Sequence, residues 1–167
     1  MILLEKIYTT ILYWVRSNKN KERVIIYICK ILPYITAISY VGLIIYVLAF
    51  NRDLVFYIIS IPITIFLVVT ILRKIWNRSR PYEIFNIQPL FQNKIGESAP
   101  SRHTASAFAI ALVGLLVNPY VGVILCFVAS MIAISRFIAG VHFISDILIA
   151  IILAILIYLA FILIFPI

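Results

Sequence analysis

The sequence predicts an all-α membrane protein, a polytopic bundle of transmembrane helices that forms one membrane-embedded domain over residues 1–167. The first observation behind this prediction is composition, because 65% of the residues are hydrophobic, 12% are charged and the mean hydropathy is +1.16. A soluble domain is usually about half apolar and about a quarter charged. The second observation is that the charges avoid long stretches of the chain. We therefore expect the excess apolar surface to face lipid.

Four stretches without Asp, Glu, Lys or Arg predict the membrane spans. They cover residues 31–51, 54–72, 103–135 and 147–167. A helix needs about 20 apolar residues to cross the hydrocarbon core, so the third stretch is too long for one span. Asn118-Pro119 lies in its middle and predicts a turn. We expect five spans, at roughly 33–51, 54–72, 103–117, 120–138 and 145–165.

The N-terminal residues predict a helix on the membrane surface. Residues 2–15 are too short to cross the bilayer easily, and they carry one acidic and one basic residue. The aromatic side chains that suit the headgroup zone of an interfacial amphipathic helix are Tyr8, Tyr13 and Trp14. Residues 24–32 either add a partial span or extend the next helix. A sixth, short crossing within residues 1–32 therefore stays open.

The net charge of +8 gathers in two clusters. The first contains Arg16, Lys19, Lys21, Arg23 and Lys30, and the second contains Arg73, Lys74, Arg78, Arg80, Lys94 and Arg102. The first cluster is typical of a segment that faces anionic headgroups or follows the positive-inside bias. For the second cluster that interpretation competes with a substrate site. Nucleic acid is not an expected partner, because these basic residues are not on a soluble domain.

Three polar segments stand at predicted helix ends, at residues 73–81, 98–104 and 135–146. The ionisable residues of the C-terminal part of the chain, counting acids, bases and imidazoles, are His103, Arg136, His142 and Asp146. Both histidines of the chain are in this set. Ionisable side chains inside a membrane protein are costly and usually functional. The order of the spans brings all three segments to one membrane face, where they can form one site.

The second of these segments has the features of an anion site. Pro100-Ser101 leads into a helix that begins near His103, and a helix N-terminus presents free N–H groups and the positive end of its dipole. The Ser101 hydroxyl can add a donor. Planar guanidinium groups that match the geometry of phosphate oxygens come from Arg80, Arg102 and Arg136. The pattern therefore favours a phosphate ligand.

The two histidines suit the chemistry of phosphoryl transfer. His142 and Asp146 are four residues apart and share one face if both are helical. A carboxylate bonded to one ring nitrogen fixes the tautomer and leaves the other nitrogen free to attack. His103 then remains for proton transfer to the leaving oxygen.

Structural alternatives stay open for each of these residues. The two histidines could bind zinc, although a zinc site needs further ligands and Asp146 is the only acid nearby. Asp146 and Arg136 could form a buried ion pair that fixes helix packing. Arg80-Pro81 alone could mark a helix end, and His103 alone could start a helix without taking part in chemistry.

Together the three segments resemble the signature of the type 2 phosphatidic acid phosphatase superfamily, whose pattern is K-x6-R-P, then P-S-G-H, then S-R-x5-H-x3-D. The third motif is complete and runs from Ser135-Arg136 through His142 to Asp146. In the second motif, Pro100-Ser101-Arg102-His103 has arginine where the family usually has glycine.

The first motif departs from the family pattern at its cation. Arg80-Pro81 matches, but Arg73 stands at the lysine position and Lys74 is one residue out of register. Arginine keeps the positive charge and changes the hydrogen-bond geometry. The resemblance covers residues 73–146, which we expect to hold the catalytic motifs.

The resemblance implies hydrolysis through a phosphohistidine intermediate, without a metal or another cofactor. It implies that His142 attacks phosphorus, that Asp146 orients His142, and that His103 protonates the leaving group. The residues that would hold the phosphate are Arg73 or Lys74, Arg80, Ser101 and Arg136, with Arg102 as an added ligand.

The resemblance also implies a lipid phosphate or pyrophosphate as the substrate. Small bacterial members are often undecaprenyl-pyrophosphate phosphatases, so that lipid is the first expectation, and phosphatidylglycerophosphate and phosphatidic acid are its rivals. The number of spans argues against a vanadium haloperoxidase. The complete set of His103, His142 and Asp146 argues against a lipid-binding protein without catalysis. Members that act on cell-wall lipids imply a bacterial plasma membrane with the active site on the outer face; the sequence predicts no oligomeric state.

Overall fold

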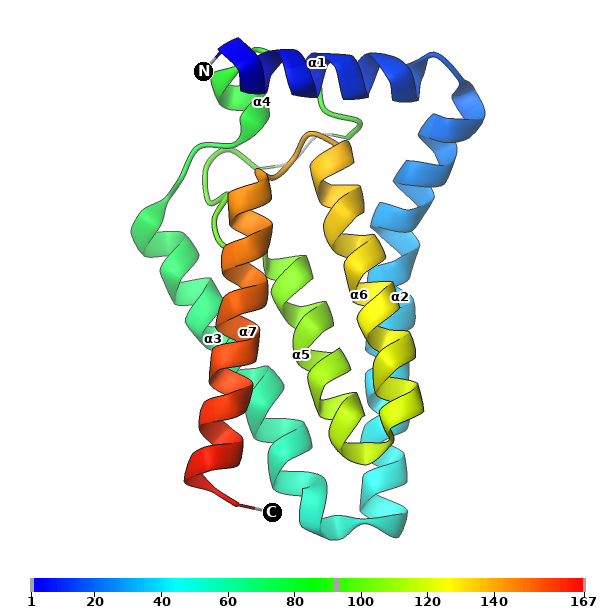
Figure 1. Ribbon diagram of the computed structural model, residues 1–167, viewed down its shortest axis with the longest axis vertical. Coiled ribbons are helices and arrows are strands. Elements are labelled where there is room, and N and C mark those ends of the chain that lie inside the picture. The colour runs from blue at the N-terminus through cyan, green and yellow to red at the C-terminus, as the bar shows by residue number, and fades with distance from the viewer. Residues whose placement is uncertain (1, 92–93, 167) are drawn as a thin grey trace.

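The computed structural model describes residues 2–91 and 94–166, and every regular element within them is a helix. The elements are α1 (Ile2–Arg16), α2 (Lys19–Phe50), the 3-10 helix η1 (Arg52–Leu54), α3 (Val55–Trp76), α4 (Pro81–Ile84), α5 (Arg102–Val117), α6 (Pro119–Ile138) and α7 (Ile144–Ile164). Figure 1 shows α2, α3, α5, α6 and α7 gathered into a bundle, with α1 across one end. The predicted all-α fold is confirmed.

The bundle helices have the length and surface of membrane spans. Four segments are long and apolar enough to cross a membrane, and they contain α2, α3, α6 and α7. The fifth helix, α5, is apolar but has 16 residues. Large exposed side chains on these helices include Ile45, Ile63, Phe127 and Leu156, and lipid is the solvent that favours such a surface. The chain is an integral membrane protein, with helices at all five predicted positions and one of them short.

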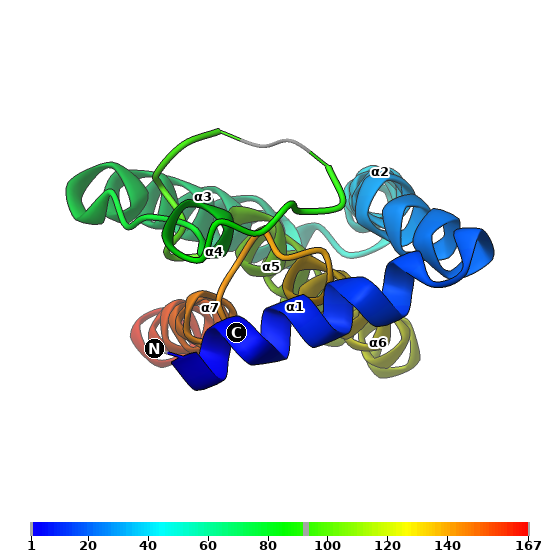
Figure 2. The same cartoon turned by 90° about the horizontal axis from the view of Figure 1, so that it is seen from above.

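The N-terminal helix α1 lies across the end of the bundle, nearly at right angles to the other helices (Figures 1 and 2). Its buried side chains are Tyr8, Leu12 and Val15. Residues 19–50 form one continuous helix, so residues 24–32 extend α2, which was one of the two alternatives. Within the described residues, no helix remains for a sixth crossing.

The centre of the bundle is α5, which packs against α6 most extensively and also against α3, α7 and α2. Its buried small residues include Ala105, Ala107, Ala109, Ala111 and Gly114, and such residues let neighbouring helices approach closely. Near the turn between α5 and α6, a Cβ atom on Gly122 would lie 2.5 Å from the Cα atom of Leu115. Glycine is therefore required at this contact.

The predicted turn at Asn118-Pro119 separates α5 from α6. The Asn118 side chain accepts hydrogen bonds from the backbone N–H groups of Tyr120 and Val121, so it caps the start of α6. Pro119 follows at the first helical position, where its missing N–H has no intrahelical partner to lose. These local interactions explain why one long apolar stretch folds as two helices.

The order of the helices brings the three polar segments to the end of the bundle that carries α1 (Figure 1). There α3 ends at Trp76, α5 begins at Arg102, and residues 139–143 join α6 to α7. A helix of 16 residues rises only about 24 Å, against about 30 Å for the hydrocarbon core. The N-terminus of α5 accordingly lies deeper in the bundle than the neighbouring ends of α6 and α7.

Candidate active site

Asp146 is the fully buried centre of the polar cluster, in the first turn of α7. Its Oδ2 atom accepts the Ser98 hydroxyl at 2.5 Å and the Phe143 backbone N–H at 2.9 Å. Its Oδ1 atom accepts a hydrogen bond from Arg78 Nη1 at 2.7 Å, and the same contact is an ion pair between the two side chains. The alternative, an ion pair between Asp146 and Arg136, is therefore not found among the described residues. These contacts hold the carboxylate in one orientation.

His142 lies in the turn just before α7, with its ring against Asp146. Its Nδ1 atom is 3.6 Å from Asp146 Oδ2 and has no hydrogen-bond partner among the described residues. This distance is longer than a hydrogen bond, and such contacts often tighten only when the substrate is bound. Burial lowers the pKa of His142 to about 4, although Asp146 acts in the opposite direction. The imidazole is therefore neutral near pH 7, with Nε2 as the nitrogen that does not face the carboxylate.

The α1 helix holds the turn that carries His142. The Tyr8 hydroxyl donates to the His142 carbonyl oxygen at 3.1 Å, and the Tyr8 ring packs on Phe137 and Phe143 with centroids 5.1 Å and 6.0 Å away. Tyr8 was expected to contact the headgroup zone, but it is 1% exposed and contacts the protein instead. The turn itself needs Gly140, whose φ of +74° is unfavourable for other residues.

Of the two candidate cations at the end of α3, the structure brings Arg73 to the site. Arg73 continues the buried stripe of Ile61, Ile65 and Val69, and its Nη1 atom donates to the Pro100 carbonyl at 2.9 Å. Lys74 is turned by about 100° around the helix and is exposed. The phase of the helix therefore places Arg73, and not Lys74, among the buried polar residues.

Arg80 and Arg136 are buried without a carboxylate in ion-pair range in the described part of the chain. Arg80 Nε donates to the Gly96 carbonyl at 2.9 Å, and Arg136 Nη2 donates to the Cys29 carbonyl at 2.8 Å. Arg80 is close enough to Arg73 and to Arg136 to act on both electrostatically. The Nε atoms of Arg73 and Arg136 are buried and have no partner among the described residues. Buried cations in this state favour an anion between them.

The start of α5 supplies further donors. Ser101 is fully buried at the position before the helix, and its hydroxyl pairs with the Thr104 hydroxyl at 2.9 Å. The Ser101 side chain makes no capping bond, so it leaves the first N–H groups of α5 free for a ligand. The Ser101 backbone N–H donates to the Asp146 carbonyl at 3.0 Å, which ties the start of α5 to α7.

His103 and Arg102 are exposed where the site opens toward α2 and α3. His103 lines a cavity of about 580 Å³ together with Arg136, Phe91 and Lys30. His103 and Arg102 also line an adjoining cavity of about 240 Å³, where the Arg102 guanidinium lies 5.9 Å from the ring centroid of Phe66. His103 therefore lies where two cavities meet, and one of them also reaches the buried Arg136.

The residues that match a known family model include all the polar segments of this site. The sequence model described as the PAP2 superfamily matches residues 53–166, which include the three polar segments and the helices that carry them. The chain belongs to the PAP2 superfamily. Phosphatases of this superfamily hydrolyse lipid phosphates. No curated protein matches the sequence of this PAP2 member.

Two solved structures of bacterial proteins are similar to this chain. The crystal structure of Aquifex aeolicus LpxE is 23% identical to this PAP2 protein, covers 93% of this chain and 92% of its own, and superposes with a TM-score of 0.72. The first transmembrane PAP2-type phosphatidylglycerolphosphate phosphatase from Bacillus subtilis is 18% identical, with coverage of 95% and 92% and a TM-score of 0.48. The similarity to LpxE extends the shared fold beyond the family segment to nearly the whole chain.

Three residues of this PAP2 site were not found by sequence reasoning. Arg78 and Ser98 contact the Asp146 carboxylate, and Tyr8 contacts the His142 carbonyl. Arg78 was counted only as part of a basic cluster, and Ser98 only as part of a polar segment. Each contact joins residues at least 48 positions apart, so no local pattern could reveal it. In the described part of the chain, no three His, Cys, Asp or Glu side chains gather in a set that could hold a metal ion.

Proposed function

We propose that this PAP2 protein hydrolyses a phosphate or pyrophosphate group on a membrane lipid through a phosphohistidine at His142. The observation that carries the proposal is the excess of buried positive charge beside a neutral, buried histidine. Arg73, Arg80 and Arg136 are all at most 5% exposed. Against these three cations stand a part-exposed Glu97, 3.9 Å from Arg73, and the buried Asp146, which is already paired with Arg78. A bound phosphoryl group would supply the missing negative charge.

In the first step of the proposed reaction, Nε2 of His142 attacks phosphorus as the bond to the leaving oxygen breaks. Asp146 faces Nδ1 and would stabilise the proton held there. His103 gives a proton to the leaving oxygen. Ser101, the free N–H groups of α5 and the buried arginines would stabilise the charge on the transferring group. In the second step His103 takes a proton from water, the water oxygen attacks phosphorus, and the bond from Nε2 to phosphorus breaks, which releases inorganic phosphate.

A lipid substrate fits the surroundings of His103. The cavity lined by His103 and Phe66 adjoins a further cavity of about 260 Å³ lined by Tyr40, Ile63 and Leu67. Together they follow α5 between α2 and α3, which diverge toward the end of the bundle that carries α1 (Figure 1). A hydrocarbon chain can occupy such an apolar path. Undecaprenyl pyrophosphate is our first candidate, with phosphatidylglycerophosphate and phosphatidic acid next.

Phosphate release by the purified protein tests the proposal. Wild type and His142→Ala are compared on the three lipids in detergent, with EDTA present throughout. We expect release by wild type, loss of release in the variant, and a rapidly quenched intermediate labelled on histidine from a lipid with radioactive phosphorus. Lipid binding without phosphate release by wild type would favour a non-catalytic lipid-binding protein, and full activity of His142→Ala would refute the role of His142.

We also propose that the site faces the outside of a bacterial plasma membrane, as the resemblance to phosphatases of cell-wall lipids implies. Because α1 lies at the same end as the site, the N-terminus must then be outside as well. The positive-inside bias makes the opposite prediction, since Arg52 is the sole Lys or Arg on the connections at the far end.

Labelling in intact cells separates these two orientations. Cys29 and Cys126 are replaced by alanine, and single cysteines are introduced as Asn20→Cys at the α1 end and Tyr120→Cys at the far end, where both side chains are exposed. An impermeant maleimide that labels only Asn20→Cys would support the outer face. Labelling of only Tyr120→Cys would place the site in the cytoplasm and overturn this part of the proposal.

A further inference from the structure

Two exposed cations line the cavities that meet at His103. Lys30, on α2, lines the cavity of about 580 Å³, and Arg102, on α5, lines the cavity of about 240 Å³. The two cavities share Pro33, Ala37 and His103, so they adjoin at the imidazole. The larger cavity also contains the buried Arg136, so a ligand that extends from Arg136 past His103 lies in a space lined by both cations.

Lys30 and Arg102 differ from the buried arginines in their surroundings. Both are exposed, and no carboxylate of the described chain lies within ion-pair distance of either. Arg102 instead lies over the Phe66 ring, which keeps its guanidinium at the mouth of the cavity. Arg102 also occupies the position at which the family pattern has glycine. Neither charge is needed to balance an acid of the protein, so both are available to a second anion.

We propose that Lys30 and Arg102 form a second anion subsite that makes the enzyme selective for a lipid diphosphate. This inference rests on the proposed function. The terminal phosphoryl group would bind among the buried arginines, and the phosphate attached to the lipid would lie beyond His103, between Lys30 and Arg102. When Nε2 of His142 bonds to the terminal phosphorus, the bond to the bridging oxygen breaks. That oxygen keeps the electron pair, takes the proton of His103 and leaves as part of a lipid monophosphate.

The charges explain why Lys30 and Arg102 would accelerate hydrolysis of a diphosphate more than hydrolysis of a monophosphate ester. With a diphosphate the departing group is itself anionic, and cations placed where negative charge develops stabilise the transition state. With a monophosphate the departing group is a neutral alcohol after protonation, so it gives Lys30 and Arg102 no anion to bind. Charge-assisted hydrogen bonds to a phosphate are among the stronger polar contacts. The subsite therefore raises the ratio of diphosphate hydrolysis to monophosphate hydrolysis.

The test compares undecaprenyl diphosphate with undecaprenyl monophosphate, which share the same hydrocarbon chain, in one detergent. The variants are Arg102→Gly, which installs the glycine of the family pattern, and Lys30→Gln. Lys19→Gln is the matched control, because it removes an exposed cation from α2 about 16 Å along the helix from Lys30. We expect the ratio of kcat/KM on the diphosphate to kcat/KM on the monophosphate to fall about tenfold in each variant. Lys19→Gln should change neither activity.

The possible failures are distinguishable. If wild type hydrolyses both lipids and the two variants keep the wild-type ratio, the subsite is refuted and the proposed function stands. The same holds if wild type accepts the monophosphate and not the diphosphate, or if both activities fall together in Arg102→Gly and Lys30→Gln. If wild type releases phosphate from neither of these lipids and from neither rival lipid phosphate, the proposed function fails as well.

Discussion

The hydroxyl of Tyr8 offers a direct test of how the N-terminal helix supports the site. Tyr8→Phe removes one oxygen atom, which donates to the His142 carbonyl at 3.1 Å, and keeps the ring that packs on Phe137 and Phe143. A buried hydrogen bond of this kind contributes about 0.5–1.5 kcal/mol. If that energy holds His142 in the geometry of attack, its loss lowers kcat by about 2- to 13-fold. KM should not change, because Tyr8 has no contact with the proposed phosphate ligands.

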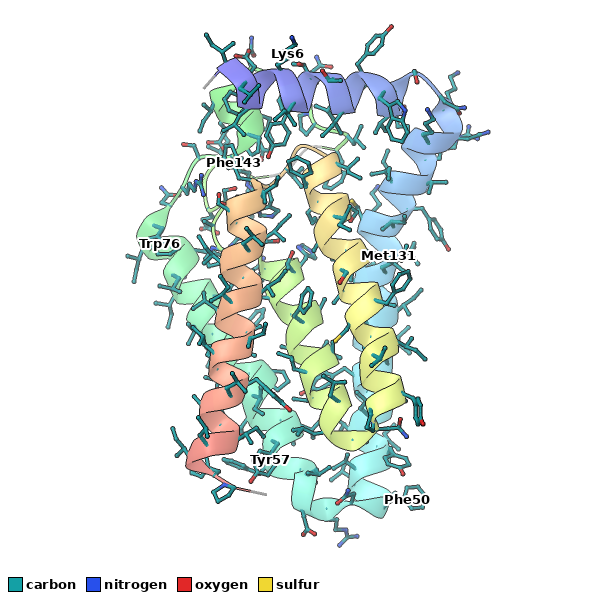
Figure 3. All side chains as sticks on the ribbon, viewed as in Figure 1. Lys6, Phe50, Tyr57, Trp76, Met131 and Phe143 are labelled. Carbon is teal, nitrogen blue, oxygen red and sulfur yellow. The ribbon has the colours of Figure 1, made fainter. Side chains whose placement is uncertain are left out.

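Tyr57→Phe is the matched control for this prediction. The Tyr57 hydroxyl also donates to a backbone carbonyl, that of Phe165, at 2.8 Å. Figure 3 shows Tyr57 near the end of the bundle opposite to Phe143, which follows His142. Both variants should lower the thermal midpoint in detergent by similar amounts, while only Tyr8→Phe lowers kcat for phosphate release. Equal kcat values for the two variants would refute a positioning role for Tyr8.

Three further predictions follow from the same geometry. Because the pKa of His142 is lowered to about 4, the neutral form persists in weak acid, so the fall of kcat/KM with acid should have its midpoint near pH 4. A midpoint near pH 6.5, the ordinary histidine value, would contradict this. Arg73→Ala should reduce phosphate release about a hundredfold, whereas Lys74→Ala should change it less than about twofold; equal losses would mean that the helix phase is misjudged. Gly122→Ala should destabilise the bundle by about 1–3 kcal/mol in a denaturation assay, while Gly42→Ala, where nothing lies within 4 Å, should not; equal stability of the two variants would contradict the close contact of α5 and α6.

The sequence predicted the bundle well because the membrane restricts what a charge-free stretch can do. Each long apolar stretch became a helix, and Asn118-Pro119 divided the longest one through a cap that two adjacent residues encode. The convergence of the polar segments followed from the number of crossings between them. Predictions of this kind depend on local composition and on whether an odd or even number of membrane crossings separates two segments. Both can be read from a single sequence.

The parts that sequence did not predict depend on contacts between distant segments. Tyr8 was expected in the headgroup zone because an aromatic residue on a short amphipathic helix usually lies there, and only the fold places it under α1 against His142. Ser98 has no motif of its own, and its role as a partner of Asp146 comes from the loop that reaches α5. The choice between Arg73 and Lys74 needed the phase of α3, which motif spacing alone leaves open by one residue.

In the proposed reaction, the depth at which α5 begins would separate the two reactants of hydrolysis. The lipid would reach His103 from the side, through the apolar cavities lined by residues of α2, α3 and α5, and would stay in the membrane. Water and inorganic phosphate would instead pass among the polar connections at the end of the bundle that carries α1. A phosphoryl group held on His142 would thus face solvent after the lipid has withdrawn into the bilayer. If the proposed function holds, such an arrangement would favour transfer of the phosphoryl group to water over transfer to another lipid.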